Sequence, residues 1–225
     1  MSEAIVVSGT DTGVGKTWVT AHLAEAMADS GVAVAVRKPV QSYDPDDGRT
    51  DAEILAAASG VDPTAVCPRH RWYEIPLAPP MAAEALRRPP ILVRRLVDET
   101  EVPARAITLI EGVGGARSPL ADDGDTVALA AAFGAVLVVL VAPAGLGAIN
   151  AVRLGVTAFD PVPVIVHLNR FDATNDTHVR NLGWLRKKDG FVVSSSIAEL
   201  AGALMERRGM HASQEQQASA PMEVR

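Results

Sequence analysis

The chain is poor in residue types that mark several large classes of protein. It has one cysteine in 225 residues, Cys67, so it can form no internal disulfide and offers no cysteine-based zinc site. We therefore expect a reducing, cytoplasmic setting. Aromatic residues make up only 4% of the chain although 48% is hydrophobic, so a core must consist mainly of Ala, Val, Leu and Ile. Such a composition is typical of parallel α/β sheets.

Positive charge is also scarce. The formal net charge is −6 at pH 7, and the sequence pI is near 5.4. Binding to a nucleic-acid backbone needs clustered Lys and Arg, which this balance disfavours. We expect no nucleic-acid partner and a small-molecule substrate instead.

Membrane segments are not expected either. No basic segment followed by an apolar stretch opens the chain, so the sequence predicts no secretory signal. Residues 127–152 are uncharged and long enough to span a bilayer, which takes ~20 residues. Gly134, Pro143, Gly145 and Gly147 interrupt that stretch. It is better explained by a helix, a buried strand and a glycine turn, so we expect no membrane partner.

Short β-rich runs alternate with helical patterns along the chain. The predicted strands are 4–8, 32–36, 107–110, 136–141, 162–168 and 191–193, and the predicted helices are 16–29, 51–59, 81–86, 149–159 and 197–207. This alternation predicts right-handed βαβ crossovers, and therefore one α/β domain whose parallel sheet has helices on both faces. The proline-rich stretch 63–90 predicts irregular connections around its short helix. We place the domain at residues 1–208 and expect a disordered tail at 209–225, which lacks apolar periodicity.

A glycine-rich loop follows the first predicted strand. Residues 9–17 read GTDTGVGKT and lead directly into a helix. Backbone N–H groups of such a loop bind phosphate oxygens, while Lys16 reaches the β- and γ-phosphates and the Thr17 hydroxyl ligates Mg²⁺. The strict pattern GxxxxGK[ST] has glycine where this chain has Thr10, so the loop is a variant. Its place between a strand and a helix favours a phosphate site over an unliganded turn.

A second candidate is the segment LIEGVGG, residues 109–115. Ligands of open α/β sheets bind at the carboxyl ends of strands, where Glu111 falls. We expect Glu111 to approach the Mg²⁺ held by Thr17, and the following glycines to bring backbone amides near the reacting groups. The alternative is a carboxylate in a surface turn. The neighbouring glycine-rich loop favours the metal site.

A third candidate is RKPVQS, residues 37–42, with Asp51 across a polar loop. Proline cannot continue a central strand, so Lys38-Pro39 marks a strand end and directs the Lys38 ammonium toward the crevice. The alternative for Lys38 is a solvated surface lysine.

Taken in order, GTDTGVGKT, KPVQS and EGVGG resemble the motifs of the dethiobiotin synthetase family. The segment GLGAIN, residues 145–150, is similar to a fourth family motif, and the similarity extends from residue 5 to about residue 170. The resemblance implies ATP-dependent carboxylation of 7,8-diaminononanoate with CO2 or bicarbonate, and ring closure to dethiobiotin with release of ADP and phosphate. It implies ATP as co-substrate, Mg²⁺ as cofactor, and a homodimer.

The resemblance also implies roles for individual residues. Lys16, Lys38 and Thr12 would act in catalysis, the two lysines by neutralising the carbamate and the transferring phosphoryl group. Thr17, Asp51 and Glu111 would hold Mg²⁺. The nucleotide would contact Gly13, Val14, Gly15, Lys16, Thr17, Asp51, Glu111, Gly112, Val113, Gly114 and Asn169. The diamine would contact Ser42 and, across a subunit interface, Gly147, Ala148, Ile149 and Asn150.

The chain departs from the family pattern at two places. Ala78-Pro79-Pro80 stands where many members have Ser-Pro-His, and the usual Gly-x-Pro segment is not evident at residues 191–196. The sequence from Asn169 to Asp172, Asn-Arg-Phe-Asp, is loosely similar to the guanine-reading pattern of GTPases. Base selectivity therefore stays open.

Two other families have related P-loop domains. Amidotransferases of the cobyrinic acid type need a glutaminase module with a nucleophilic Cys and a His base, whereas Cys67 lies inside the P-loop domain. Partitioning ATPases carry a second lysine in the loop, where this chain has Asp11. Both differences favour the dethiobiotin synthetases.

Overall fold

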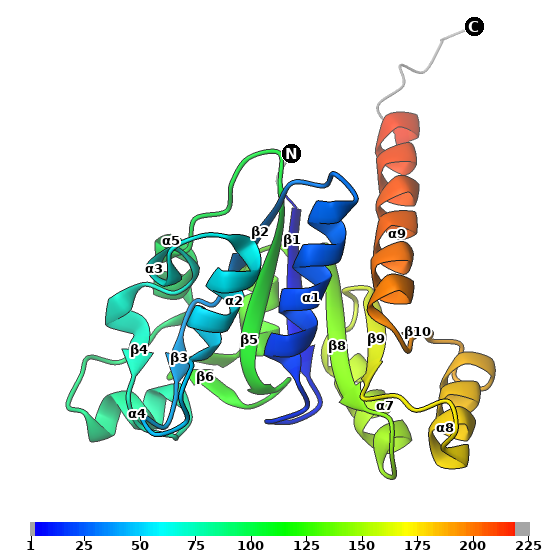
Figure 1. The fold of residues 1–225 in the computed structure, drawn as a ribbon. Coiled ribbons are helices and arrows are strands. Elements are labelled where there is room, and N and C mark those ends of the chain that lie inside the picture. Colours follow the sequence, from blue (N-terminus) through cyan, green and yellow to red (C-terminus); the bar gives the residue numbers. More distant parts are fainter. Residues whose placement is uncertain (1–2, 219–225) are drawn as a thin grey trace, which may run out of the picture.

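A parallel sheet of six strands runs through the centre of the molecule (Figure 1). The computed structural model describes residues 3–218, and the side chains of residues 3–207. The strands lie in the order β10-β9-β8-β1-β5-β2, and every neighbouring pair is parallel. Their bounds are β1 Glu3–Gly9, β2 Val34–Arg37, β5 Ile107–Gly115, β8 Leu137–Pro143, β9 Val164–Asn169 and β10 Val192–Ser194. The fold class is the expected α/β architecture.

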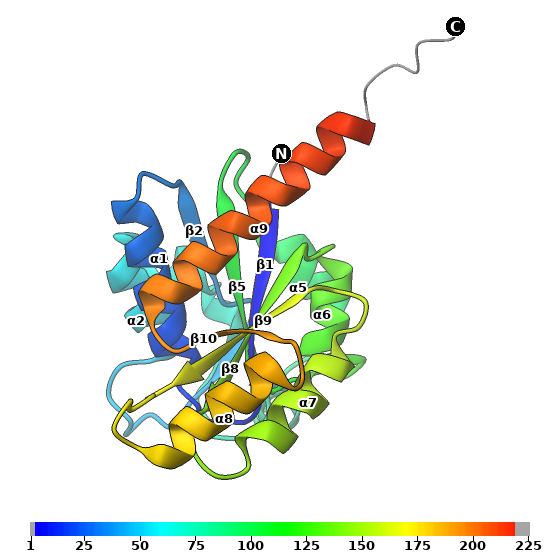
Figure 2. The same cartoon turned by 90° about the vertical axis from the view of Figure 1, so that its right-hand side faces the viewer.

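Helices cover both faces of this sheet. Figure 2 shows α1 and α2 on one side and α5, α6 and α7 on the other. Their bounds are α1 Lys16–Asp29, α2 Asp51–Ser59, α3 Pro63–Val66, α4 Pro79–Ala85, α5 Val93–Glu99, α6 Thr126–Ala132, α7 Ala148–Ala158, α8 Asp176–Lys187 and α9 Ile197–Ala218. The two faces are distinct because successive strand side chains point in opposite directions.

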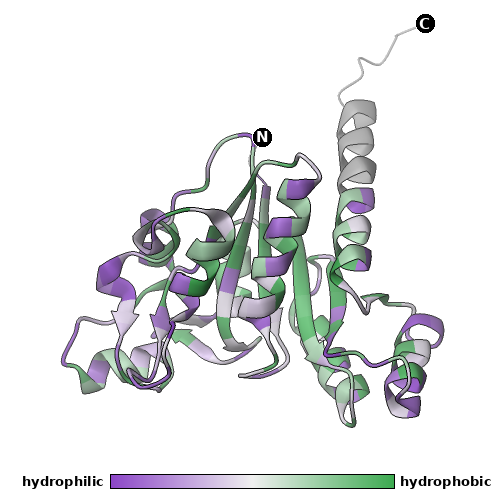
Figure 3. Cartoon of the chain, in the orientation of Figure 1, coloured by the Kyte–Doolittle hydropathy of each residue, from purple (hydrophilic) through white to green (hydrophobic). Residues whose placement is uncertain are grey.

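The core divides accordingly. Ile5 and Val7 of β1 pack with α1, α2 and α9 on one face, whereas Ala4 and Val6 of the same strand pack with α4, α5 and α6 on the other. The strands that form the centre are hydrophobic along most of their length, while polar residues lie in the outer helices and loops (Figure 3). Continuous apolar strands are expected where both faces of a parallel sheet are buried.

Strand order brings three distant segments to one edge of the sheet. β1 lies between β8 and β5, and β2 is the next strand beyond β5. The loop after β1, the end of β5 and the exit of β2 are therefore neighbours at the carboxyl edge, where α/β sheets bind ligands. Glu111 of β5 is in register with Val7 of β1, two residues before the loop begins at Gly9.

The predicted elements are confirmed in the main. The helices 16–29 and 51–59 have the bounds read from the sequence, and the uncharged stretch 127–152 forms most of α6, β8 and the turn into α7. No helix within residues 3–218 is long and apolar enough to cross a membrane. The sequence reading missed α3, α5 and α8, and two small sheets, β3 Gln41–Ser42 with β4 Trp72–Tyr73 and β6 Pro119–Ala121 with β7 Gly124–Asp125.

The last helix differs from the prediction. Residues 209–218, expected to be part of a disordered tail, continue α9 as helix to Ala218. This stretch is rich in Ala, Gln, Glu and Met, which favour helix even without an apolar stripe. The rest of the predicted tail, residues 219–225, lies outside the described residues.

Candidate active site

The glycine-rich loop joins β1 to α1. Gly13 and Gly15 have φ of 74° and 95°, a left-handed conformation that glycine adopts without strain. A Cβ on Gly15 would also collide with the side-chain amide of Asn169. Asn169 Nδ2 donates to the Val14 carbonyl oxygen at 2.9 Å, while its Oδ1 accepts from the Arg170 N–H. The asparagine therefore supports the loop from β9, and both ends of its amide have partners there.

Lys16 begins α1 and folds back over the loop. Its Nζ donates to the Asp11 carbonyl oxygen at 3.1 Å, and the residue is 8% exposed. Burial, and then the nearby positive charge of Lys38, lower the pKa of Lys16 to about 8. An ammonium in this state gains from an anionic ligand, because a phosphate would offset the cost of its burial.

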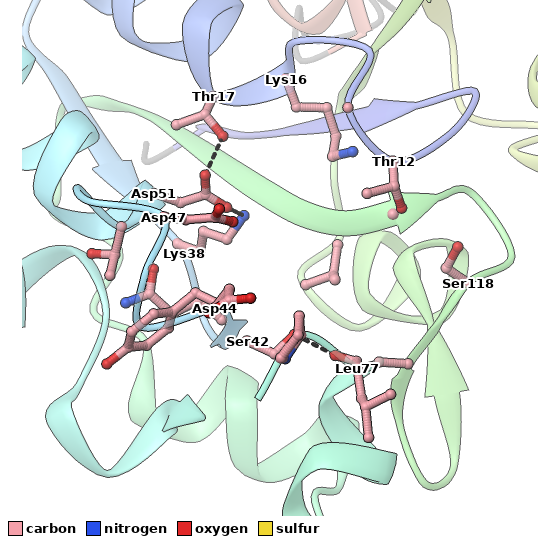
Figure 4. Close-up of a pocket in the computed structure, with 18 of the residues that line it drawn as sticks. Thr12, Lys16, Thr17, Lys38, Ser42, Asp44, Asp47, Asp51, Leu77 and Ser118 are labelled. Carbon is pink, nitrogen blue, oxygen red and sulfur yellow. Dashed lines mark hydrogen bonds and ion pairs between the residues drawn. The ribbon is translucent and has the colours of Figure 1, made fainter. Parts of the chain in front are cut away.

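Thr17, Lys38, Asp51 and Glu111 form one polar cluster beside this loop. Thr17 Oγ1 lies 2.8 Å from Asp51 Oδ1 and 2.9 Å from Glu111 Oε1. Lys38 Nζ lies 2.6 Å from Asp51 Oδ2 and 2.7 Å from Glu111 Oε1. Figure 4 shows the Thr17, Asp51 and Lys38 side chains converging from separate segments. The structure thus brings the three predicted metal-binding residues into contact with Lys38, one of the two predicted catalytic lysines.

The charges in this cluster stabilise one another. Burial acts to lower the pKa of Lys38, which is 3% exposed, but the contacts with Asp51 and Glu111 outweigh it and raise that pKa above its usual value. Burial likewise acts to raise the pKa of Asp51, and the contact with Lys38 outweighs it and lowers that pKa. Lys38 and Asp51 therefore both stay ionised at neutral pH. The alternative of a solvated surface lysine is wrong.

Glu111 retains one unused oxygen. The residue is fully buried, and its Oε2 has no hydrogen-bond partner among the described residues. Leaving a buried acceptor unsatisfied costs about 1–3 kcal/mol, so the site favours a cation there. No group of three or more His, Cys, Asp or Glu side chains that could hold a metal occurs in the described part of the chain. Two carboxylates and a hydroxyl suit Mg²⁺, which usually keeps several waters.

A cavity of about 550 Å³ opens next to the cluster. This volume lies in the usual range for small-molecule sites, about 300–1,000 Å³. Of the predicted residues, Thr12, Gly13, Gly15, Lys16, Thr17, Lys38, Ser42, Asp51, Val113 and Gly114 line it. Ser42 Oγ donates to the Leu77 carbonyl oxygen at 2.5 Å, which ties β3 to the loop that carries Ala78 (Figure 4). The predicted catalytic residues therefore face one open cavity.

Other predicted residues lie elsewhere. Asn169 lines a second cavity of about 370 Å³ together with Trp18 and Phe171. Residues 147–150 lie at the start of α7 and line neither cavity. The sequence reading missed Gln41 and Ser118, which do line the large cavity. Ser118 lies outside the sequence motifs. It reaches the cavity only because of the turn that follows β5.

Comparisons with known proteins agree with this fold. A protein-family model described as an AAA domain matches residues 3–167. A DUF1611 family protein from Anabaena variabilis shares the fold, with a TM-score of 0.53 and 18% identity over 91% of this chain and 57% of that one. The fold and the loop thus define a P-loop nucleotide-binding protein.

Sequence relatives define the family within that class. The ATP-dependent dethiobiotin synthetase BioD of Mycobacterium avium is 44% identical over 160 residues, which cover 68% of this chain and 67% of that protein. Those of Anaeromyxobacter dehalogenans and Haloferax mediterranei are each 40% identical, over 78% and 74% of this chain and 80% and 71% of theirs. The chain belongs to the ATP-dependent dethiobiotin synthetases, as its motifs indicated.

Burial of Lys38 leads to a prediction about stability. Lys38→Ala leaves two carboxylates without their cation, and we expect the free energy of unfolding at pH 7 to fall by about 3 kcal/mol. The value is at the low end of the usual 3–5 kcal/mol for a broken buried pair, because Asp51 is 39% exposed and solvent screens it. The folded-state pKa of Asp51 is lowered. The contribution of its contact with Lys38 to the free energy of unfolding is therefore present above pH 3.8 and is lost as pH falls below that value.

Urea unfolding at pH 7 and pH 3 measures this difference. The loss in Lys38→Ala should be smaller at pH 3 than at pH 7, because pH 3 lies below the unfolded-state pKa of Asp51. Lys187→Ala, at the exposed end of α8, is the matched control and should change stability by less than about 0.5 kcal/mol. Equal stability of the two variants at pH 7 would contradict the buried cluster.

Proposed function

We propose that this chain forms dethiobiotin in the 550 Å³ cavity, with ATP entering from the P-loop side and the diamine from the Ser42 side. The carbamate of 7,8-diaminononanoate takes the γ-phosphoryl group of ATP, and ADP leaves. The second amine then attacks the carbamate carbon and phosphate departs. One observation carries this proposal: on the cavity wall beside Thr17, Lys38 contacts Asp51 and the buried Glu111 behind it, which concentrates fixed charge where phosphoryl transfer needs it.

The two lysines have complementary tasks. Lys16 lies over the P-loop, where the β- and γ-phosphates bind in such loops. Lys38 lies between the carboxylates, with Gly112 O 3.4 Å from its Nζ, so its ammonium is held in a fixed direction. Preorganised cations stabilise charge in the transition state without reorganisation, and no side-chain nucleophile is needed. Thr12 and Ser42 supply hydroxyls to the same cavity.

Thr17, Asp51 and Glu111 would hold Mg²⁺. Their oxygens already meet, and the unpartnered Oε2 of Glu111 is the acceptor that a cation would satisfy. When bound, Mg²⁺ supplies positive charge to the transferring phosphoryl group. The chain's own part is to fix those oxygens: the Thr50–Glu53 capping box starts α2 at Asp51, and β5 holds Glu111.

Residues 147–150 support a homodimer. Leu146, next to them, is 92% exposed, and Leu154 of α7 is 66% exposed. Gly147 precedes α7 with φ 86°, and Asn181 holds the turn by donating to the carbonyl oxygens of Ala144 and Gly145. α7 has eleven residues, and its N-terminus can bind a carboxylate. In the proposed dimer this segment reaches the diamine's carboxylate in the partner's cavity.

The direct test of the function is product formation. With 7,8-diaminononanoate, bicarbonate, ATP and Mg²⁺, we expect one ADP per dethiobiotin, and no ADP above background without the diamine. Lys38→Ala should slow dethiobiotin formation by about 10²–10³-fold, as the loss of one preorganised donor does. Lys38→Arg should recover only part of the lost rate, because a planar guanidinium replaces a compact ammonium group. ATP turnover independent of the diamine would point to a nucleotide switch instead.

Metal dependence tests the ligand set. Asp51→Asn and Glu111→Gln should each raise the Mg²⁺ concentration needed for half-maximal rate, because each removes an anionic oxygen from a hard cation. Asp47→Asn is the matched control, since Asp47 lines the same cavity and is exposed. Its Mg²⁺ dependence should equal that of the wild type. If Asp51→Asn or Glu111→Gln needs no more Mg²⁺ than this control, the residue that it replaces is not a metal ligand.

The pKa of Lys16 predicts a pH limit. A lysine is cationic below its pKa, so kcat/KM for ATP should fall as pH rises through about 8, where the free enzyme loses the Lys16 charge. Lys16→Ala should be inactive while its melting curve stays close to that of the wild type. Lys16→Arg should keep its charge over this range, so any residual activity should no longer fall near pH 8. A wild-type profile that is flat from pH 7 to pH 9 would contradict this role.

A further inference from the structure

Ring closure needs a hydrogen-bond donor that the two lysines do not supply. When an amine attacks the carbonyl carbon, negative charge develops on the carbonyl oxygen, and preorganised donors stabilise it. Lys38 is engaged by Asp51 and Glu111, and Lys16 faces the P-loop. A further donor therefore has to come from the wall of the cavity that lies away from the Asp51 carboxylate.

Ser118 is such a donor. It lies in the turn between β5 and β6 and lines the cavity. Its Oγ accepts from the Gly115 N–H at 2.9 Å, and its own N–H donates to the Gly115 carbonyl oxygen at 3.1 Å. Among the described residues none accepts a hydrogen bond from the Ser118 hydroxyl. Because the Gly115 N–H already occupies one lone pair, the turn fixes the oxygen and leaves the hydrogen free.

Gly114 makes room for this hydroxyl. Its φ is 60°, and a Cβ at that position would collide with Ser118 Oγ while lying 3.5 Å from Thr12 Oγ1. The two hydroxyl oxygens thus border the same small volume, from the P-loop on one side and from the β5–β6 turn on the other. Figure 4 shows Thr12 and Ser118 on one side of the cavity and Asp51 with Lys38 on the other.

The two walls differ in the groups that they offer. Asp51 contributes a carboxylate that is paired with Lys38 on one side, whereas Thr12 and Ser118 contribute neutral hydroxyls on the other. A carboxylate donates no hydrogen bond to an oxygen that gains negative charge, whereas a hydroxyl does. The hydroxyl side is therefore where the carbonyl oxygen is best placed during ring closure.

We propose that the Ser118 hydroxyl donates a hydrogen bond to the carbonyl oxygen of the carbamic–phosphoric anhydride while the ring closes. In this step the free amine nitrogen attacks the carbonyl carbon, a C–N bond forms, and the C–O bond to phosphate breaks. The amine's proton leaves with the phosphate as HPO4²⁻, so atoms and charge balance. This inference rests on the proposed function of the cavity and assigns to Ser118 the second half of that reaction.

The ratio of ADP to dethiobiotin tests this assignment. In Ser118→Ala the anhydride still forms but closes slowly, so part of it hydrolyses and the ratio should rise well above one. Dethiobiotin formation should fall by about 10- to 100-fold, somewhat less than for the loss of a strong oxyanion donor. Ser118→Thr keeps the hydroxyl and its acceptor oxygen and should restore a ratio near one. Ser59→Ala removes a hydroxyl at the far end of α2 and is the matched control.

The outcomes separate the possible roles. If ADP and dethiobiotin fall together in Ser118→Ala, with the ratio at one, Ser118 only holds the turn and the proposal is overturned. Should that variant not fold, Ser118→Cys carries the test, because a thiol is a weaker donor of similar shape. A ratio above one supports the proposal and a ratio of one overturns it. Absence of dethiobiotin in the wild type would instead contradict the proposed function of the whole cavity.

Discussion

The contact of Lys38 with Asp51 and Glu111 is the interaction on which the rest of the site depends. Each charge is at least partly removed from water, and none would be stable there without the others. The three residues come from the exit of β2, the start of α2 and the middle of β5. The cluster therefore holds together the segments that form the cavity, and it does so with groups that phosphoryl transfer can use.

The cavity is organised by this cluster into two unlike sides. The Asp51 carboxylate, the Thr17 hydroxyl and the two ammonium groups line one part of it, where we propose that the phosphoryl group is transferred, and the neutral hydroxyls of Thr12 and Ser118 line the part that we propose for the carbonyl. A reaction with two consecutive steps gains from such a division, because charge develops at different atoms in each. The protein offers positions and fixed charge, and the substrates themselves supply both nucleophiles.

Glycines near the site allow polar side chains from other segments to approach the backbone closely. Gly15 leaves space for the Asn169 amide beneath the P-loop, and Gly114 leaves space for the Ser118 hydroxyl. In both cases a side chain would occupy the volume of a polar group from another segment. Asn169, which the family resemblance places among the nucleotide contacts, also donates to the Val14 carbonyl oxygen of the loop.

The sequence alone determined the alternating strands and helices and the P-loop with Lys16 and Thr17, because each is encoded in a contiguous stretch with a local physical signature. Four short motifs, at separate places along the chain, indicated the family. It left Lys38 open between a solvated and a functional lysine, and it left Ser118 unnoticed. Only the tertiary structure decided these, since Lys38 and Glu111 are 73 positions apart and meet because β2 lies beside β5 in the sheet. The burial of Lys38, the unpartnered oxygen of Glu111 and the two sides of the cavity arise from strand order and packing. No short motif encodes these.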